Sequence, residues 1–128
     1  MTAPKSMERY AYYWVAGFTD PQEIVRVLPI EPFRIGEREN GEKLWEVRSA
    51  LLVNGGFIDA HLETLLETLE DHTDSIHQLS QRYDSGINCV GYFIDEHPGF
   101  HLSADILRRL CALGVSVDFD LYCYHDDA

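Results

Sequence analysis

The feature that most limits the fold is an internal repeat: residues 10–28 recur, without a gap, at residues 92–110. Six of the nineteen aligned positions are identical, and they include a Gly-Phe pair in each copy, Gly17-Phe18 and Gly99-Phe100. Each copy has the pattern of a β-strand, a Gly-Phe corner and a short amphipathic helix. The match predicts a repeated strand–helix unit. It indicates how the chain is built and carries no chemistry.

Alternation, caps and turn residues indicate where the other elements lie. The Asp20-Pro21 pair starts a helix, and Asn40-Gly41 is typical of a hairpin turn. A leucine stripe marks a long helical pattern, which a break near His72 divides in two. We expect strands at residues 8–16, 33–37, 43–49, 87–95 and 115–124, and helices at 21–28, 58–69, 73–83 and 104–113.

This order predicts an α+β fold. We expect a single, largely antiparallel sheet of about five strands with helices on one face, containing a pseudo-repeated β-α-β unit and related to the ferredoxin-like folds. The strand at residues 8–16 is apolar on both alternating faces, so we expect it to be central and covered on both sides. No linker divides the sequence, which favours one domain over residues 1–128. The pattern does not indicate which strand lies at the edge.

The net charge of −12 is distributed unevenly. Residues 1–48 hold seven Lys/Arg and eight Asp/Glu, a net of −1, whereas residues 49–128 hold three and fourteen, a net of −11. Phosphate binding draws on clusters of cations, so we expect no nucleic-acid partner and no binding to an anionic membrane. The sequence has no apolar run long enough to span a bilayer and no apolar signal segment before the first strand. A cytoplasmic location is therefore the default expectation.

The three cysteines, Cys89, Cys111 and Cys123, are an odd number and lack CxxC spacing. Two of them fall in apparent core strands and one on a helix. We expect buried, reduced thiols and no disulfide.

Two histidines, His97 and His101, flank a Pro98-Gly99 corner. Histidines four apart bind a metal well when a helix aligns them, and Pro-Gly prevents a helix there. No third ligand is identifiable, so we assign no metal site and no cofactor.

Common catalytic signatures are absent: the chain has no GxSxG, P-loop, GxGxxG or HExxH motif. Asp118 and Asp120 share one face of a strand beside Tyr122 and Tyr124, at a separation of roughly 7 Å that would suit a pair of glycosidase carboxylates. Exposed strands produce the same spacing without any catalysis. We assign no catalytic residue, and a non-catalytic role is favoured while an enzyme that uses this pair stays open.

The acidic face of the two central helices is the stronger candidate for a functional surface. Like charges one helical turn apart cost a few tenths of a kcal/mol per pair, so helix stability does not explain the arrangement. A basic partner would convert that cost into fast, steered association, whereas the alternative is a solvated face. The candidate partner-binding residues are Asp59, Glu63, Glu67, Glu70, Asp71 and Asp74, with no cation near them in the sequence.

The two Gly-Phe corners suggest a second kind of site. If the corners flank a cleft, its candidate ligand-binding residues are Trp14, Tyr92, Phe100 and His101. The alternative for the aromatic first strand, with Tyr10, Tyr12, Tyr13 and Trp14, is core packing, because successive side chains point to opposite faces.

Three segments together resemble an uncharacterised bacterial family, catalogued as a domain of unknown function, family 4279. They are YAYYWVAGFTDPQEIVRVLPIEP, the tryptophan segment KLWEV, and NCVGYFIDEHPGFHLSADILRRLCALGVSVDFDLYCY. The resemblance covers nearly the whole chain. It implies a bacterial origin and this α+β layout, and it supplies no activity, substrate or catalytic residue.

Two functional hypotheses follow. The first is a non-catalytic acidic domain that binds a basic protein, for example an immunity-type inhibitor of a basic toxin. The second is a small-molecule binding or sensing module with a cleft between the two Gly-Phe corners. The oligomeric state stays open, since an exposed strand edge can pair with another chain.

Overall fold

The computed structural model describes residues 8–49, 57–94 and 100–124. Its elements, in chain order, are β1 (Arg9–Ala16), α1 (Gln22–Val27), β2 (Arg34–Glu37), β3 (Lys43–Arg48), α2 (Ile58–Leu69), the 3₁₀ turn η2 (Glu70–His72), α3 (Thr73–Arg82), β4 (Asp84–Ile94), α4 (Ala104–Leu113) and β5 (Val117–Tyr124). The predicted order of strands and helices is confirmed, and η2 lies at the predicted break. The largest shift is at β4, which begins three residues earlier than expected because Asp84 pairs with Ala16 of β1.

The five strands form one sheet in the order β2-β3-β1-β4-β5. β1 is antiparallel to both β3 and β4, β2 is antiparallel to β3, and β4 and β5 are parallel. The first four strands thus have the order of a ferredoxin-like β-α-β-β-α-β unit, and β5 extends it by one strand. The last pair is parallel because α4 is a crossover connection between β4 and β5. The expected α+β fold is confirmed, and β2 and β5 are the edge strands.

The internal repeat corresponds to two strand–helix–strand units. α1 begins at Gln22 and α4 at Ala104, which are 82 positions apart, the same offset as the sequence repeat. In each unit the two strands are parallel; β3 lies between β1 and β2, whereas β4 and β5 are direct neighbours. The strand parts match less closely. β1 shifted by 82 positions covers residues 91–98, of which only 91–94 belong to β4, and 95–98 lie outside the described residues.

The helix ends are fixed by the caps that the sequence indicated. The N–H of Gln22 donates to Oδ1 of Asp20, and the N–H of Asp20 donates to Oε1 of Glu23, so the two side chains cap α1 reciprocally. Ser103 accepts from the N–H of Ile106 at the start of α4, and Gly114 ends that helix at φ 69°.

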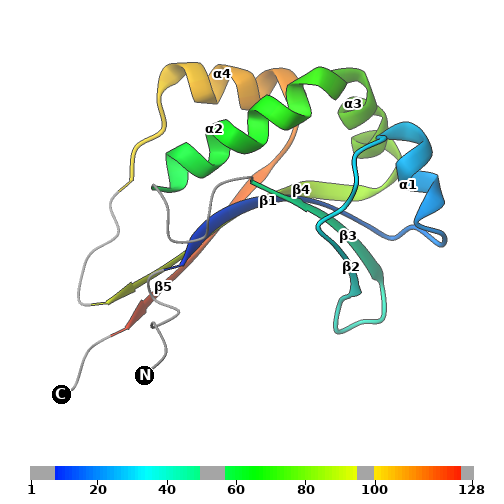
Figure 1. The fold of residues 1–128 in the computed structure, drawn as a ribbon, viewed down its shortest axis with the longest axis horizontal. Coiled ribbons are helices and arrows are strands. Elements are labelled where there is room, and N and C mark those ends of the chain that lie inside the picture. The colour runs from blue at the N-terminus through cyan, green and yellow to red at the C-terminus, as the bar shows by residue number, and fades with distance from the viewer. Residues whose placement is uncertain (1–7, 50–56, 95–99, 125–128) are drawn as a thin grey trace.

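The helices all lie on one face of the sheet, and the core is between them (Figure 1). β1 and β3 contribute alternate side chains, including Tyr13 and Trp45, and α2 contributes its leucine stripe. A leucine such as Leu62 that is fully buried stabilises the fold by about 1.5–3 kcal/mol. This layer fixes the position of the strands, and hence of the residues on their other face.

The opposite face of the sheet corrects one expectation. β1 is central, as predicted, but the described helices cover it on one side only (Figure 1). Its second row of side chains, Tyr10, Tyr12 and Trp14, is nevertheless half-buried or buried. Neighbouring side chains on the same face cover these rings, and their polar atoms keep hydrogen-bond partners there.

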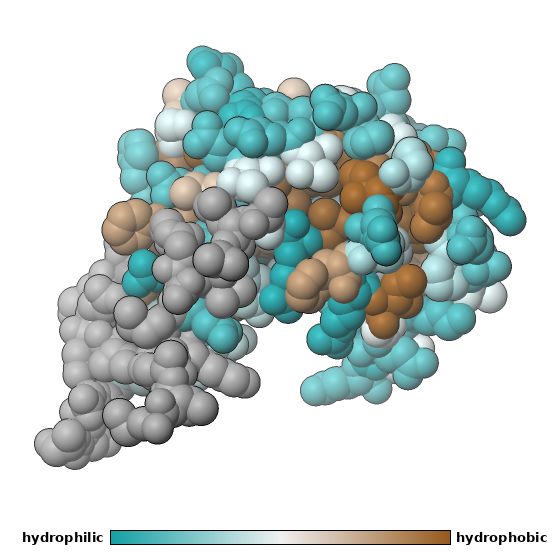
Figure 2. All heavy atoms as spheres, viewed as in Figure 1, coloured by the Kyte–Doolittle hydropathy of each residue, from teal (hydrophilic) through white to brown (hydrophobic). Residues whose placement is uncertain are grey.

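The sheet is arched. The β2–β3 hairpin and the far ends of β4 and β5 bend away from the helices, so the uncovered face is concave (Figure 1). In the same view the outer surface of the helices is mainly hydrophilic, whereas hydrophobic residues gather where α1 and the β2–β3 hairpin lie (Figure 2). Phe33 and Ile35 of this region are 60% and 47% exposed.

The three cysteines differ in burial. Cys89 is buried in β4, as expected, but Cys111 and Cys123 are exposed, and all three are free thiols. The expectation of buried thiols was therefore wrong for two of them. Cys123 lies near the end of an edge strand, and Cys111 lies on the outer side of α4.

Candidate functional site: the concave face of the sheet

The concave face consists of the side chains that point away from the helices on the four longest strands. Register places Tyr12, Asn88 and Asp118 side by side across β1, β4 and β5, and it pairs Tyr92 with Tyr122. Because side chains alternate along a strand, the same face continues at every second residue. Its members are Tyr10, Tyr12, Trp14, Leu44, Glu46, Arg48, Asn88, Val90, Tyr92, Asp118, Asp120, Tyr122 and Tyr124.

Asn88 is the centre of a hydrogen-bond network on this face. Its Oδ1 accepts from Nε1 of Trp14 at 3.1 Å, and its Nδ2 donates to the hydroxyl of Tyr12 at 2.9 Å and to Oδ2 of Asp120 at 3.4 Å. Burial raises the pKa of Tyr12, and the hydrogen bond from Asn88 partly offsets this rise. One amide thus holds two aromatic rings and a carboxylate in fixed positions.

A hollow of about 340 Å³ opens beside this network. It is lined by Tyr12, Trp14, Arg38, Leu44, Asn88 and Asp118. Gly86 is the β4 partner of Trp14, and an added Cβ there would come within 2.9 Å of Oγ of Ser116 and 3.4 Å of Cζ2 of Trp14. The glycine therefore lets Ser116 approach β4 closely beside the Trp14 ring.

Two arginines of the chain stack on aromatic rings of this region. The guanidinium of Arg38 lies 4.5 Å from the Trp14 ring centre, and its Nη1 pairs with Glu42 at 3.3 Å and Asp84 at 3.4 Å. Arg48 lies 4.3 Å from the ring of Tyr10. The ring of Phe33 lies at the same distance, 4.3 Å, from Arg48. These distances are within the range of cation–π attraction, so the aromatic rings act as sites for guanidinium groups.

At the β5 side the concave face carries a stack of three tyrosines, Tyr92, Tyr122 and Tyr124, which we call the tyrosine ladder. The rings of Tyr92 and Tyr122 are 4.9 Å apart with an interplanar angle of 15°, and Tyr92 and Tyr124 are 6.4 Å apart at 5°. Tyr122 is 45% and Tyr124 49% exposed. Flat, nearly parallel rings are thus presented to solvent at the edge of the sheet.

Asp118 and Asp120 share the concave face, as the alternation predicted. Asp118 is exposed and lines the hollow, whereas Asp120 is half-buried and accepts the hydrogen bond from Asn88. An exposed carboxylate on an open sheet supplies charge for binding.

The four residues predicted to line a cleft between the corners do not gather in one place. Trp14 pairs with Gly86, six positions from Tyr92, so the backbone positions of the two residues are about 20 Å apart along the sheet. Phe100 and His101 line a separate, mostly apolar hollow of about 340 Å³ with Arg9, Phe57, Ile58, Asp59 and Phe93. Because β1 and β4 are antiparallel, the strand ends that precede the two corners lie at opposite ends of the sheet. Gly99 and His97 are outside the described residues.

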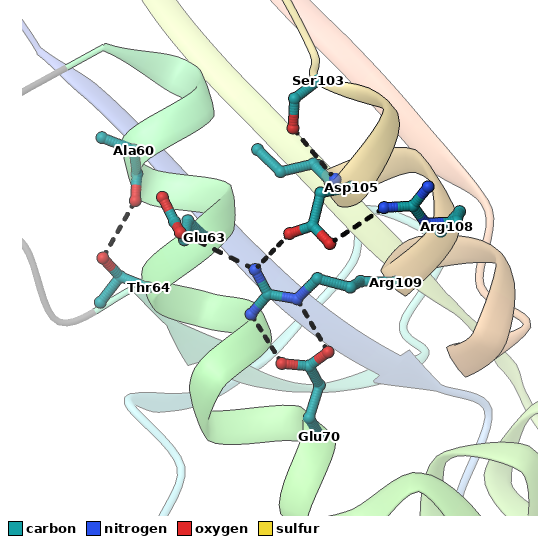
Figure 3. A network of polar contacts seen from close by, with 9 residues as sticks. Ala60, Glu63, Thr64, Glu70, Ser103, Asp105, Arg108 and Arg109 are labelled. Atoms are coloured by element: carbon teal, nitrogen blue, oxygen red, sulfur yellow. Dashed lines mark hydrogen bonds and ion pairs between the residues drawn. The ribbon is translucent and has the colours of Figure 1, made fainter.

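Two of the acidic helix residues form ion pairs with an arginine, Arg109. Arg109 of α4 reaches across to Glu70, the first residue of η2, and binds it with two hydrogen bonds, Nε to Oε2 at 2.9 Å and Nη2 to Oε1 at 2.6 Å (Figure 3). Its Nη1 lies 3.8 Å from Glu63 and 3.5 Å from Asp105. The hydrogen bonds from Arg109 lower the pKa of Glu70, and the same bonds raise the pKa of Arg109. The expectation of an unpaired acidic run is therefore corrected.

The rest of the acidic set remains open to solvent. Glu67, Asp71 and Asp74 are exposed, and within the residues that the structure describes none of them makes an ion pair. Asp59 lies apart from them, at the apolar hollow. The six residues thus divide into a pair held by Arg109, a solvated group of three, and one at the other end of α2.

Some residues of interest were missed in the sequence. His61 is buried in α2 and its Nδ1 lies 2.9 Å from Oγ of Ser49. Its position on the apolar stripe, three residues after Ile58, would have indicated burial. Asn88 could have been assigned to the concave face by alternation, whereas Arg38 comes from a hairpin loop and had no such signal. Among the described residues no group of three His, Cys, Asp or Glu side chains is placed to hold a metal ion.

The fold and this face define a class: an α+β domain with a ferredoxin-like strand order, whose described helices lie on one side of the sheet and whose other side is an aromatic, concave face. The chain belongs to the family described as "Domain of unknown function (DUF4279)", whose model matches residues 7–124. No curated protein and no solved structure matches it. In the described part of the chain no helix has the length and apolar character needed to cross a membrane. The family description assigns no activity.

Proposed function

We propose that this protein is a non-catalytic protein-binding domain and that the concave face of the sheet is its contact surface. The observation that carries the proposal is the composition of that face. Five of the seven tyrosines of the chain lie on it, together with Trp14 and the stacked guanidiniums of Arg38 and Arg48. Tyr, Trp and Arg are the residue types most enriched where protein interfaces derive their binding energy.

The rigidity of the face supports the same proposal. Trp14 and Tyr12 are held by Asn88, and Arg48 is held between two rings. Side chains that are already fixed lose little conformational entropy when a partner binds. An arched sheet also presents these groups on a concave surface, which suits a protruding segment of a partner.

The hollow beside Asn88 keeps a small-molecule ligand as the alternative. Its volume of about 340 Å³ is at the small end of the range for ligand pockets. Asp118, Arg38 and the Tyr12 hydroxyl would supply the polar contacts. The same hollow is large enough to take a single side chain of a protein partner, which is the role we assign to it.

Site-specific photocrosslinking tests the proposal. A benzophenone amino acid is placed in the full chain at Tyr122 on the concave face, at Glu67 on the acidic helix face, or at Gln22 on α1 as an exposed control. We expect irradiation in the cells of origin to link one discrete protein from position 122 and nothing from position 22. A link from position 67 alone, or from no position, would contradict the concave face as the contact surface.

A second candidate uses the acidic helices to bind a basic protein, such as a toxin that this chain would inhibit. The supporting observation is the exposed group of Glu67, Asp71 and Asp74, which makes no ion pair within the described residues. Reversal of Glu67 and Asp71 to Lys should then abolish capture of the partner. Reversal of Glu31 and Glu39, two exposed acids outside the helices, is the matched control and should leave capture unchanged.

A further inference from the structure

We propose that the tyrosine ladder and the two aspartates beside it bind an arginine side chain of the protein partner. The inference rests on the proposed function and adds the chemistry of the group that the concave face recognises. It depends on three observations: a pattern that the chain already uses twice on this face, a third place where the same pattern is incomplete, and the charge that is left there.

The pattern is a guanidinium lying on an aromatic ring. Arg38 lies on Trp14 with the carboxylate of Asp84 at 3.4 Å. Arg48 lies between Tyr10 and Phe33, 4.3 Å from each ring centre. In both cases a planar cation covers the flat side of a ring on the concave face. The face is therefore built to hold guanidinium groups, and two of its own residues demonstrate the geometry.

The third place has rings and carboxylates but, in the part of the chain that the structure describes, no cation paired with them. Tyr122 follows Asp120 by two residues on the same strand face, so their Cα atoms are roughly 7 Å apart. Asp118 lies another two residues back. Within the described residues neither aspartate has an ion pair, although Asp120 accepts a hydrogen bond from Asn88. The rings of Tyr122 and Tyr124 are about half exposed, at 45% and 49%.

The distribution of charge over the concave face favours a cationic ligand at the tyrosine ladder. The β2–β3 side of the concave face carries Arg34, Arg38 and Arg48, with Arg34 paired to the buried Glu46 at 3.5 Å. The β5 side carries the carboxylates of Asp118 and Asp120. A cation is therefore attracted to the β5 side, and an anionic ligand such as a nucleic acid is repelled from it. A guanidinium fits better than an ammonium, since it can stack on a ring and donate to a carboxylate in the same plane.

The test uses capped pentapeptides of sequence Gly-Arg-Gly-Arg-Gly, in which the two arginines project on the same side of an extended chain, one for each aspartate. Peptides with Lys or citrulline at both positions are the controls for charge and for shape. Binding to the full chain is measured by ¹H–¹⁵N spectra at an ionic strength of about 0.15 M, which suppresses attraction by the net charge alone.

We expect the Arg peptide to shift signals of residues 118–124 and to bind about threefold or more tightly than the Lys peptide. The citrulline peptide should not bind. Tyr122→Ala should weaken the Arg peptide about three- to fivefold, and D118N/D120N about fivefold or more. The matched control D71N/D74N removes the same charge from α3 and η2 and should change the affinity less than twofold.

Equal loss from D118N/D120N and D71N/D74N, or equal affinity for Arg and Lys peptides, would overturn the inference, because binding would then follow net charge alone. So would shifts confined to the helix residues around Glu67. These outcomes leave the proposed function standing if the crosslink from Tyr122 is observed. Loss of that crosslink instead removes the proposed function, whatever the peptides do.

Discussion

The indole nitrogen of Trp14 donates a hydrogen bond of 3.1 Å to the side chain of Asn88, which joins β1 to β4 across the concave face. The same amide donates to the hydroxyl of Tyr12 at 2.9 Å. Polar atoms of two large rings are thus satisfied on a face that no described helix covers. This explains how a strand can be apolar in both of its rows and still present one row outward.

Asn88→Ala should therefore destabilise the fold. The change leaves the Trp14 N–H and the Tyr12 hydroxyl without their partner in a partly buried setting, which costs about 1–2 kcal/mol. Urea unfolding followed by fluorescence measures the free energy of unfolding. Gln78→Ala, at an exposed position of α3, is the control and should change it by less than about 0.5 kcal/mol. Equal effects of the two changes would contradict the role of Asn88.

Arg109 and its neighbour Arg108 provide a matched pair. Arg109 is 20% exposed and forms ion pairs with Glu63, Glu70 and Asp105, whereas Arg108 is 75% exposed and, among the described residues, pairs with Asp105 only. Arg109→Met should destabilise the protein by about 1 kcal/mol, because three carboxylates lose their shared cation. Arg108→Met should have almost no effect. Thermal unfolding at low and high salt distinguishes them, since the effect of Arg109 should shrink as salt increases.

The Glu70–Arg109 contact also predicts a pH dependence. The folded-state pKa of Glu70 is lowered from its usual 4.5, chiefly by the hydrogen bonds from Arg109. A lowered carboxyl pKa stabilises the folded state above the unfolded value, and this contribution is lost as pH falls through the folded value. The stability difference between wild type and Glu70→Gln should be constant near neutral pH and should decrease below pH 4.5. A difference that stays unchanged under acid would show that the contact does not depend on the charge of Glu70.

The three cysteines should differ in the rate at which their thiols react. Burial, with a smaller contribution from Asp120, raises the pKa of Cys89 to about 12, and its side chain is inaccessible. Cys111 and Cys123 are exposed. Ellman's reagent at neutral pH should titrate two thiols rapidly in the native protein and the third only after unfolding in denaturant. Rapid titration of all three would contradict the burial of β4.

The sequence predicted the fold well because its signals are local. The Asp20–Glu23 cap, the break at His72 and the alternation of β5 each follow from neighbouring residues. The open concave face was missed because a strand with apolar or aromatic side chains on both of its faces, such as β1, is normally covered by other elements on both sides. Tyr and Trp satisfy that pattern equally well on an open face, where their polar atoms find partners.

The candidate sites depended on contacts that local patterns do not contain. Arg109 meets Glu70 from a separate helix, 39 positions later in the chain, so no inspection of α2 alone could have paired the acidic residues. The described residues predicted to line a cleft between the Gly-Phe corners lie apart for a topological reason. Adjacent antiparallel strands place their following corners at opposite ends of the sheet.

The most direct measurement of the central claim uses the two tryptophans of the chain as probes. Trp14 lies on the concave face and Trp45 is fully buried in the core, so their indole N–H signals report on the two sides of the sheet. The crosslinked partner, once purified, is titrated into ¹⁵N-labelled protein, with Trp14→Phe used to assign the two signals. If the concave face is the contact surface, the Trp14 signal shifts or broadens, and the Trp45 signal and the amides of α2 and α3 stay in place. Shifts confined to α2 and α3, with an unchanged Trp14 signal, would contradict the account.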